Sequence, residues 1–373
     1  MRVLINALSV SNLSGRHVLL GHLRKISEWT RDKHRYVVLF NDSNRDMCGD
    51  LGPNVEWCEC PGYTAHWMGR STWELTHLSR LAAKRKCDFL FTPAGTVVPG
   101  FSLPQVSFAQ NPWCLVGGVD RGARGEIKAL LQRRAYRQAV NRAAMMVYNS
   151  HFMQAAYHAN AAAAARRSEV VYQALDDSTF DRARAARAAV ARTSLQVLSV
   201  SAWGSHKGAE TVVRAIATVR ERHRIPVMLV LAGSWPDSAY ERRVRSLIHQ
   251  LGMDDHVQIL GYVSRDHLES LYAGSRVFTL MSHCESFGIP AVEAQAFGTP
   301  VVSSNCCAIP EICGAGGRFP EAGDAEATAD ALALLLEDEQ EWENLSNAAR
   351  ENASRFRWDD CSRDLLKMFE VVH

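Results

Sequence analysis

The feature that most constrains the fold is a pattern that occurs twice along the chain: short apolar runs of β-strand length alternate with longer segments of helical periodicity. Such alternation predicts parallel βαβ units. In the first half we expect strands at residues 3–7, 36–40, 87–92, 105–109 and 145–149. In the second half the runs are nearly continuous in apolar residues, which fits strands covered on both faces, at residues 196–202, 227–233, 256–261, 276–281 and 301–304.

The length of 373 residues predicts two domains, each able to bury its own core. An Ala- and Arg-rich segment separates the two patterns and contains one more short strand, at residues 169–173. We place the boundary near residue 188, so that residues 1–188 form the first domain and residues 189–355 the second. The last segment is helical in pattern, and its apolar residues need a partner. We therefore expect residues 356–373 to return to the first domain, using Trp358, Leu365, Leu366 and Phe369.

The composition is that of an ordinary globular protein, with a formal net charge of +2, which argues against a dedicated nucleic-acid binder. No apolar run is long enough to span a bilayer, and the N-terminus lacks a signal-peptide pattern, so we expect a cytoplasmic protein. The ten cysteines include no C-x-x-C pair and are expected to be reduced and structural.

Residues 285–304, ESFGIPAVEAQAFGTPVVSS, carry the densest chemical information. They predict a turn, a short helix that begins near Pro290, and a further strand. The turn at residues 286–289 would present backbone N–H groups at a helix N-terminus, which favours phosphate, and Gly288 would allow a ligand to approach closely. Glu285 and Glu293 could then hold sugar and ribose hydroxyls around a bound pyrophosphate. The alternative is that Glu293 only complements the helix dipole and Glu285 is a solvated loop residue.

This segment resembles the E-x7-E motif of retaining glycosyltransferases of the GT-B fold, specifically glycosyltransferase family 4. The similarity extends through most of the second domain, in the segments LSVSAWGSHKGAETVVRAI, LVLAGSWP, ILGYVSRDHLESLYAGSRVFTLMS and SSNCCAIPEICG. The resemblance implies two Rossmann-like α/β/α domains facing an interdomain cleft, with a nucleoside-diphosphate sugar bound to the second domain. It also implies UDP or GDP as the nucleotide, a hexose as the transferred sugar, and a glycan or lipid-linked acceptor.

The resemblance assigns roles to individual residues. Lys207 would contact the pyrophosphate and Glu285 the sugar hydroxyls, and these two are the residues we expect to carry catalysis. Glu293 would bind the ribose. The phosphate or sugar would be cradled by the turn, and the nucleobase would rest near the end of a strand; these donor-binding positions are Ser286, Phe287, Gly288 and Ile289 for the turn, and Gly261, Tyr262 and Val263 for the nucleobase.

One departure from the family concerns phosphate binding. Many members carry an Arg five residues before the Lys, where this chain has Ala202. A lone Lys lacks the bidentate fork of an Arg, so another cation could substitute or the pyrophosphate could bind more weakly. The departure leaves open a GT-B protein that binds a sugar nucleotide with little or no turnover.

The first domain resembles the family less closely. The loop at residues 8–15 would bring Ser14 and Gly15 beside a phosphate or sugar, with a helix beginning near Arg16. The G-x-G-x-x-G pattern of dinucleotide dehydrogenases is absent from this first turn. Where many relatives have a His before the acceptor loop, this chain has Gln110 and Asn111, which cannot act as general bases at neutral pH. The Asn111–Pro112 pair is equally compatible with a simple turn.

Residues 121–142 form a basic helical pattern whose apolar component is Ile127, Leu130, Leu131, Ala135 and Val140. Such a helix could contact an anionic membrane surface at the inner face of the membrane. The alternative, which we favour, is an ordinary domain helix with a solvated basic face. No D-x-D sequence occurs, in agreement with an enzyme that needs neither a metal ion nor a cofactor. A sugar-nucleotide epimerase of the same fold is a further alternative, disfavoured by the transferase motif.

Overall fold

The computed structural model describes residues 1–119, 121–189 and 193–373. The chain divides into two compact units, each described by itself below. Unit 1 comprises Met1–Leu115, Arg121–Ala174 and Arg357–His373, and unit 2 comprises Val116–Asp120 and Leu175–Phe356. The chain thus enters unit 2 at Leu175, whereas the position expected from the sequence, residue 188, lies inside a helix, Asp177–Ala189.

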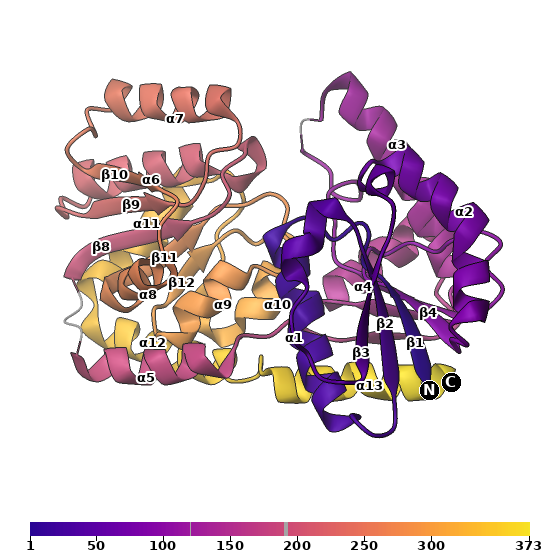
Figure 1. Cartoon of the computed structure of the whole chain (residues 1–373). Coiled ribbons are helices and arrows are strands. Elements are labelled where there is room, and N and C mark those ends of the chain that lie inside the picture. Colours follow the sequence, from indigo (N-terminus) through magenta and orange to yellow (C-terminus); the bar gives the residue numbers. More distant parts are fainter. Residues whose placement is uncertain (120, 190–192) are drawn as a thin grey trace. The chain divides into compact units, whose positions relative to one another are not determined.

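Unit 1 is built on a parallel sheet of seven strands in the order β3-β2-β1-β4-β5-β6-β7, with helices on both faces (Figure 1). The strands are β1 (Arg2–Asn6), β2 (Arg35–Phe40), β3 (Val55–Glu59), β4 (Phe89–Thr92), β5 (Gln105–Ala109), β6 (Met145–Tyr148) and β7 (Ser168–Val170). The helices are α1 (Leu13–Trp29), α2 (Trp67–Lys84), α3 (Gly122–Arg142), α4 (His151–Ala161) and α13 (Trp358–Val372), with the 3-10 turns η1 (Asp42–Met47) and η2 (Gly62–Ala65).

Unit 2 repeats this plan with a parallel sheet of six strands in the order β10-β9-β8-β11-β12-β13. The strands are β8 (Thr193–Val200), β9 (Met228–Ala232), β10 (Val257–Gly261), β11 (Ser275–Leu280), β12 (Val301–Ser303) and β13 (Gly317–Arg318). The helices are α5 (Asp177–Ala189), α6 (Ala209–Glu221), α7 (Ser238–Gln250), α8 (Arg265–Gly274), α9 (Ile289–Ala296), α10 (Ile309–Cys313), α11 (Ala325–Glu337) and α12 (Glu339–Ala353), with the turns η3 (Ser205–Lys207) and η4 (Gly314–Gly316).

The expected α/β class with two parallel sheets is confirmed. Two strands escaped the sequence analysis. In β3 the sequence VEWCE interrupts its apolar residues with two glutamates, which suits an edge strand that is only partly buried. The two-residue strand β13 is too short to leave a pattern.

The C-terminal helix α13 belongs to unit 1, as expected. Leu365 and Phe369 are buried in the core beneath the sheet, where the Phe369 ring meets Phe89 and Phe91 edge-on at centroid distances of 5.3 and 5.0 Å. At its other end the Trp358 ring fills the space beside Gly21, where an added Cβ would lie 2.2 Å from the ring. Any larger residue at position 21 would therefore displace the helix.

Helix α3 corrects the expected burial pattern of the basic segment. Its buried residues are Ala129, Tyr136, Ala139 and Val140, and Tyr136 stacks on Tyr157 of α4 with ring centroids 4.5 Å apart. The three larger aliphatic residues expected on the packed face are exposed instead, by 63% at Ile127, 63% at Leu130 and 56% at Leu131. Two of the four buried residues are alanines, and Tyr136 makes the ring contact with α4.

Candidate active site

The carboxyl edge of the unit 2 sheet contains the topological switch point. The chain leaves β8 toward β9 and leaves its neighbour β11 toward β12, so the loops after β8 and β11 diverge. In parallel α/β sheets ligands bind at such a point. Lys207 ends the turn η3 that follows β8, and Glu285 lies in the loop that follows β11. The sequence therefore places its two expected catalytic residues at the position that the topology favours.

Lys207 and Glu285 form a direct ion pair. The distance from Nζ of Lys207 to Oε1 of Glu285 is 2.5 Å, and the two side chains are 16% and 14% exposed. The loops that carry them are locked together, because the His283 amide donates to the His206 carbonyl at 2.8 Å. Burial, followed by the charge of Lys207, lowers the pKa of His206. A neutral imidazole thus lies beside the lysine, and the positive charge of this pair of loops is concentrated on Lys207.

Gly208 explains how the two loops come so close. Its φ of +69° lies in the left-handed region, and an added Cβ would lie 2.0 Å from the Met281 carbonyl oxygen. Only glycine combines this backbone conformation with this contact. The glycine of the SHKG segment therefore brings the lysine loop against the strand that leads to Glu285.

The turn before α9 follows the expected strand–turn–helix arrangement. Gly288 is the N-cap residue of α9 and has a φ of +91°. Because glycine has no side chain, it makes no side-chain capping hydrogen bond. Pro290 lies in the first turn of the helix. Phe287 is buried, and its ring packs edge-on against Phe356 at 5.2 Å. Phe287 can therefore serve a ligand only through its backbone. Ser286 precedes Phe287, and Ile289 follows Gly288 as the first residue of α9. Ser286 is also the residue directly after Glu285 of the ion pair.

Glu293 lies inside α9 and is held by two residues that the sequence analysis did not single out. Its Oε1 accepts a hydrogen bond from Arg265 at 2.5 Å, and its Oε2 accepts one from the Tyr272 hydroxyl at 2.9 Å. The Glu293 side chain is 9% exposed. The interpretation that this carboxylate only complements the helix dipole does not describe these contacts.

The expected nucleobase position lies at the end of β10. Gly261 has φ +66°, and its carbonyl accepts from the Gly233 amide at 2.7 Å, which joins the ends of β9 and β10. The Tyr262 side chain is 80% exposed, and Val263 packs partly against the core. Ala202, where many relatives have Arg, is exposed just after β8. No cation stands at that position in the sequence.

In unit 1 the structure corrects the expected glycine loop after β1. Helix α1 begins at Leu13 rather than near Arg16, because Asn12 caps it: the Gly15 amide donates to Oδ1 of Asn12 at 2.6 Å. Ser14 and Gly15 thus lie in the first helical turn, with Ser14 exposed. The Gly15 amide already donates its hydrogen bond to Asn12, so a ligand at this turn would have to bind other groups.

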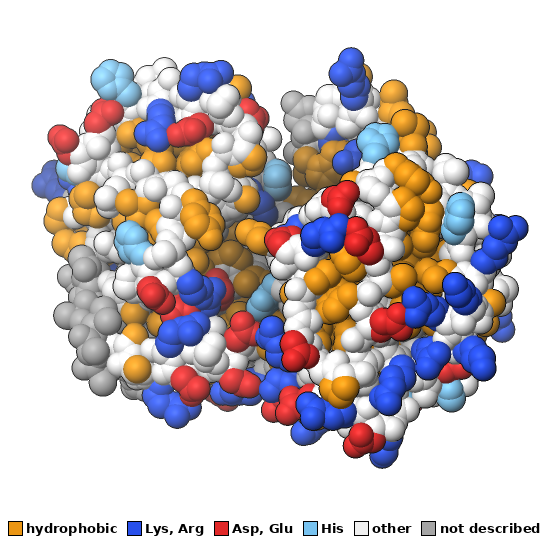
Figure 2. Space-filling model, in the orientation of Figure 1, with side chains coloured by type: hydrophobic (Ala, Val, Ile, Leu, Met, Phe, Trp, Pro, Cys, Tyr) orange, Lys and Arg blue, Asp and Glu red, His pale blue; other side chains and the backbone are white. Residues whose placement is uncertain are grey.

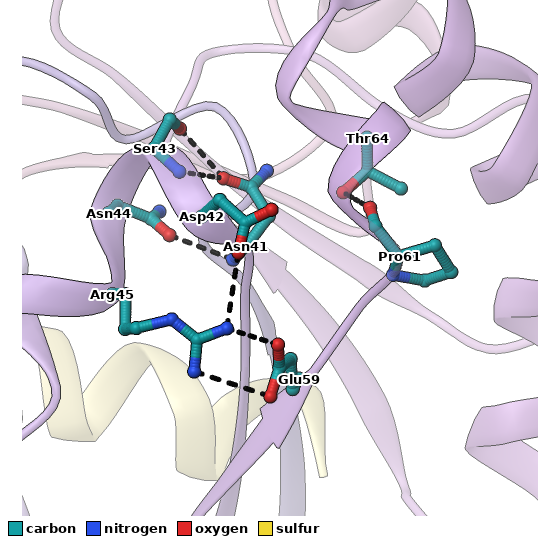
Figure 3. Close-up of polar contacts among 8 residues, drawn as sticks. All are labelled: Asn41, Asp42, Ser43, Asn44, Arg45, Glu59, Pro61 and Thr64. Carbon is teal, nitrogen blue, oxygen red and sulfur yellow. Dashed lines mark hydrogen bonds and ion pairs between the residues drawn. The ribbon is translucent and has the colours of Figure 1, made fainter.

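Two buried asparagines of the η1 region, Asn41 and Asn44, hold the loop after β1, and Figure 3 shows the contact between these two residues. Asn44 donates to the carbonyls of Ala7 and Val10 at 2.7 and 3.2 Å, and its Oδ1 accepts from the Asn41 amide at 2.9 Å. Asn41 donates to the Leu8 carbonyl at 3.1 Å. Both side chains are fully buried, so this edge of the sheet is fixed by neutral amide groups.

Gln110 and Asn111 follow β5 at the same edge. The Gln110 side chain donates to the Pro93 carbonyl at 3.3 Å, and Oδ1 of Asn111 accepts from the Trp113 amide at 3.0 Å. The second contact is an Asx turn, the structural role that the Asn-Pro pair suggested. The side chains of Gln110 and Asn111 are amides, which cannot act as a general base at neutral pH.

Sequence reasoning missed a carboxyl group in unit 1. Glu74 of α2 accepts a hydrogen bond from Asn6, the last residue of β1, at 2.7 Å. Burial raises the pKa of Glu74, and the hydrogen bond from Asn6 partly offsets this effect. The sequence offers no signal for this pair because the two residues are 68 positions apart. In unit 2 a signal did exist: Arg265, Glu269 and Tyr272 recur at the spacing of one helix face.

The residues that the structure describes contain neither a cluster suited to a metal ion nor a helix suited to span a membrane. No group of three or more His, Cys, Asp and Glu side chains in them is arranged to hold a metal ion. Among the helices of the same residues, none is both long and apolar enough to cross a membrane.

Comparison with known proteins gives a family match for unit 2. Residues 182–352 match the family model described as glycosyl transferases group 1. A D-inositol 3-phosphate glycosyltransferase of Corynebacterium urealyticum is 31% identical over 173 residues, which are 44% of this chain and 40% of that protein. O-antigen chain mannosyltransferase B of Escherichia coli is 29% identical over 152 residues, 40% of this chain and 39% of that protein. The chain thus spans about two fifths of the length of these curated relatives.

Solved structures match the whole chain. HepE of Anabaena, solved in complex with UDP and glucose, gives a TM-score of 0.74 at 19% identity and covers 100% of both chains. A sucrose-phosphate synthase from Thermosynechococcus elongatus gives a TM-score of 0.77 at 19% identity, with 100% and 99% covered. The expected GT-B fold is confirmed. Residues 182–352 are therefore similar to glycosyl transferases group 1, and the likeness to the solved structures shows the fold.

Proposed function

We propose that this protein transfers a hexose from a nucleoside diphosphate, UDP or GDP, to a hydroxyl of a glycan or lipid-linked acceptor, in the assembly of a cell-surface polysaccharide or glycoconjugate. The observation that carries the proposal is the Lys207–Glu285 pair at the switch point beside the start of α9. A lysine and a helix N-terminus favour phosphate, while a neighbouring carboxylate accepts hydrogen bonds from sugar hydroxyls. The names of the two relatives refer to D-inositol 3-phosphate and to mannosyl transfer, and these substrates are those of the relatives.

In the proposed donor complex, Lys207 exchanges part of its bond to Glu285 for the pyrophosphate. Glu285 then accepts hydrogen bonds from the sugar, and the backbone at Ser286, Phe287, Gly288 and Ile289 surrounds the phosphate or sugar. The nucleobase rests near Gly261, Tyr262 and Val263, and Glu293 binds the ribose. The donor is a substrate, and no cofactor enters the proposal.

We propose retention of configuration without a metal ion. Lys207 and the α9 N-terminus supply the positive charge that the leaving diphosphate needs. Gln110 and Asn111 are amides in local hydrogen bonds, so the leaving phosphate itself would accept the proton of the acceptor hydroxyl. Ser14, Gly15, Gln110 and Asn111 belong to the acceptor side of this proposal.

The test is a transfer assay with UDP- and GDP-linked hexoses and a panel of glycan and lipid-linked acceptors. We expect the release of nucleoside diphosphate to depend on the acceptor. NMR should show that a donor with an axial glycosidic bond gives a product with an axial glycosidic bond. Binding of donor with neither transfer nor hydrolysis across the panel would favour the alternative, a sugar-nucleotide-binding protein without turnover. The observation behind that alternative is the exposed alanine at position 202.

We also propose that α3 of unit 1 contacts an anionic membrane surface. Ile127, Leu130 and Leu131 are exposed together on one helix face, and exposed basic residues accompany them at Arg124, Lys128 and Arg134. Elsewhere on the visible surface, basic and acidic side chains are interspersed (Figure 2). Replacing the three aliphatic residues by Ser should abolish flotation with vesicles that contain anionic lipid, while vesicles of neutral lipid bind neither protein. Unchanged flotation of the triple variant would contradict this contact.

A further inference from the structure

A ladder of alternating charges runs from α5 to Glu293 within unit 2. Glu269 of α8 accepts from Arg182 of α5 at 2.5 Å through one oxygen and from Arg265 at 2.5 Å through the other. Arg265 in turn bonds Glu293 at 2.5 Å. The two carboxylates are 7% and 9% exposed, whereas the two guanidinium side chains are about two fifths exposed. Nearly buried carboxylates are stable only when paired, so each arginine compensates a neighbour.

Arg265 uses three nitrogens of its guanidinium at once. Nε donates to Glu269, one terminal nitrogen donates to Glu293, and the other donates to the Thr179 hydroxyl at 3.1 Å. A planar fork bound on three sides has little freedom to rotate. The orientation of the Glu293 carboxylate is fixed on its Oε1 side by this arrangement.

Tyr272 fixes the other side of the same carboxylate. Its side chain is fully buried, and its hydroxyl donates to Oε2 of Glu293 at 2.9 Å. Burial, and then the charge of Glu293, raise the pKa of Tyr272 well above its usual range. The phenol therefore stays protonated and remains a donor. Each carboxylate oxygen has two lone pairs, so after these two contacts each oxygen retains capacity for one more hydrogen bond.

The position of Arg265 in the chain connects two parts of the proposed donor site. Arg265 opens α8 directly after the segment Gly261–Ser264, where we propose that the nucleobase rests. Its side chain then reaches the carboxylate for which we propose ribose as the ligand. The Arg265 side chain therefore connects the segment proposed to bind the nucleobase, Gly261–Ser264, with the carboxylate proposed to bind the ribose, that of Glu293.

We propose that Arg265 and Tyr272 are positioning residues that hold the Glu293 carboxylate oriented toward the ribose diol of the bound nucleotide, an inference that rests on the proposed function. The consequence is selectivity: the wild-type protein should prefer a ribonucleotide to its 2′-deoxy or 3′-deoxy analogue, and this preference should depend on Arg265. If Arg265 only stabilised the fold, its replacement would weaken the binding of the ribonucleotide and of its deoxy analogues by the same factor.

The experiment measures by calorimetry the affinities of UDP and GDP and of their 2′-deoxy and 3′-deoxy analogues. For the nucleotide that binds, Arg265→Met should weaken the ribonucleotide about 10- to 100-fold, as expected for loss of charged hydrogen bonds, and should change the deoxy analogues little. Arg265→Lys keeps the charge without the fork and should restore part of the preference. Tyr272→Phe, an isosteric change, should reduce the preference by a smaller factor.

The matched control is Arg245→Met. Arg245 makes the same i, i+4 ion pair with a helical glutamate, Glu241, at 2.7 Å, but on α7. This control should leave every affinity unchanged. If wild-type protein binds a nucleotide and Arg265→Met, folded by circular dichroism, leaves the ratio of ribo to deoxy affinity unchanged, the positioning role is wrong and the proposed function stands. If wild-type protein binds no nucleotide at all, both are overturned.

Discussion

The carboxyl edges of the two sheets share a topology and differ in chemistry. In unit 2 the segments that follow the strands, loops and helix starts alike, carry two charged pairs, Lys207 with Glu285 and Arg265 of α8 with Glu293 of α9. In unit 1 the corresponding edge is fixed by neutral amides, above all Asn41 and Asn44. The difference indicates which edge suits which substrate: a charged edge can compensate an anionic diphosphate, whereas an amide edge can hydrogen-bond a neutral hydroxyl compound without compensating charge.

The largest expected effect tests the charged edge. Glu285→Gln keeps the shape of the side chain and removes its charge, so transfer should fall by about 100- to 1000-fold, the size expected when a preorganised electrostatic contact is lost. Steady-state kinetics with the donor that the transfer assay identifies would measure it. Glu241→Gln, a change at an ion-paired glutamate of α7, is the control and should leave turnover unchanged. Full activity of Glu285→Gln would remove the proposed role of this edge.

The amide edge should respond in stability rather than in donor binding. Asn44→Ala deletes three hydrogen bonds and leaves two carbonyls and one amide of buried loops without their partner, so the free energy of unfolding of unit 1 should fall by about 2–4 kcal/mol. Urea unfolding would measure the loss. Ser43→Ala, in the same turn but exposed, should cost less than about 1 kcal/mol. A weaker affinity of Asn44→Ala for the nucleotide would show that the two edges are not independent.

One buried histidine of unit 1, His22, gives a pH dependence. Burial, and then the nearby His17, lower the pKa of His22 to about 3. Because the unfolded chain binds a proton at this histidine below about pH 6.5 and the folded chain does not, His22 destabilises the fold as the pH falls from about 6.5 toward 3. The expected loss is about 1.4 kcal/mol per pH unit in this window.

Urea unfolding at pH 7 and pH 5 would test this sign. His22→Gln should remove this contribution, so that its stability falls less between the two pH values than that of the wild type. All other titrating groups are common to both proteins, and their contribution cancels in the difference. Equal losses in the two proteins would mean that His22 is protonated in the folded state.

The smallest expected effect concerns the acceptor side. If Gln110 only bonds the Pro93 carbonyl, Gln110→Ala should lower turnover by less than about tenfold, because loss of a general base would cost about 100-fold or more. Turnover and the KM of the acceptor would both be measured. A loss of 100-fold or more would place Gln110 in the chemistry itself and revise the account of the amide edge.

The contrast between the edges also shows what the sequence could predict. The strands and the Lys207 and Glu285 positions follow from local patterns: continuous apolar runs, a glycine turn and a proline at a helix start. The partners of Glu293 could not be derived in this way, because Arg265 and Tyr272 reach it from a helix that precedes it by more than twenty residues along the chain. Long-range contacts of this kind depend on how helices pack on the sheet.

In unit 1 the structure differs from two expectations. Helix α1 begins three residues earlier than expected because Asn12 caps it, whereas the resemblance to the family predicts a loop there. In α3 hydrophobicity alone favours burial of Ile127, Leu130 and Leu131, but all three are exposed. The buried face is set by the packing of Tyr136 and its helical neighbours against α4, a long-range contact that the sequence pattern does not give.

The most direct test of the central claim is a calorimetric titration of the wild-type protein and of Lys207→Ala with UDP and with GDP. One of the two nucleotides should bind the wild-type protein, and Lys207→Ala, shown to be folded by circular dichroism, should weaken this binding at least tenfold, since a partly buried charge contact to phosphate is lost. Absence of binding to the wild-type protein, or equal affinity in the variant, would contradict the assignment of the charged edge of unit 2 to the donor diphosphate.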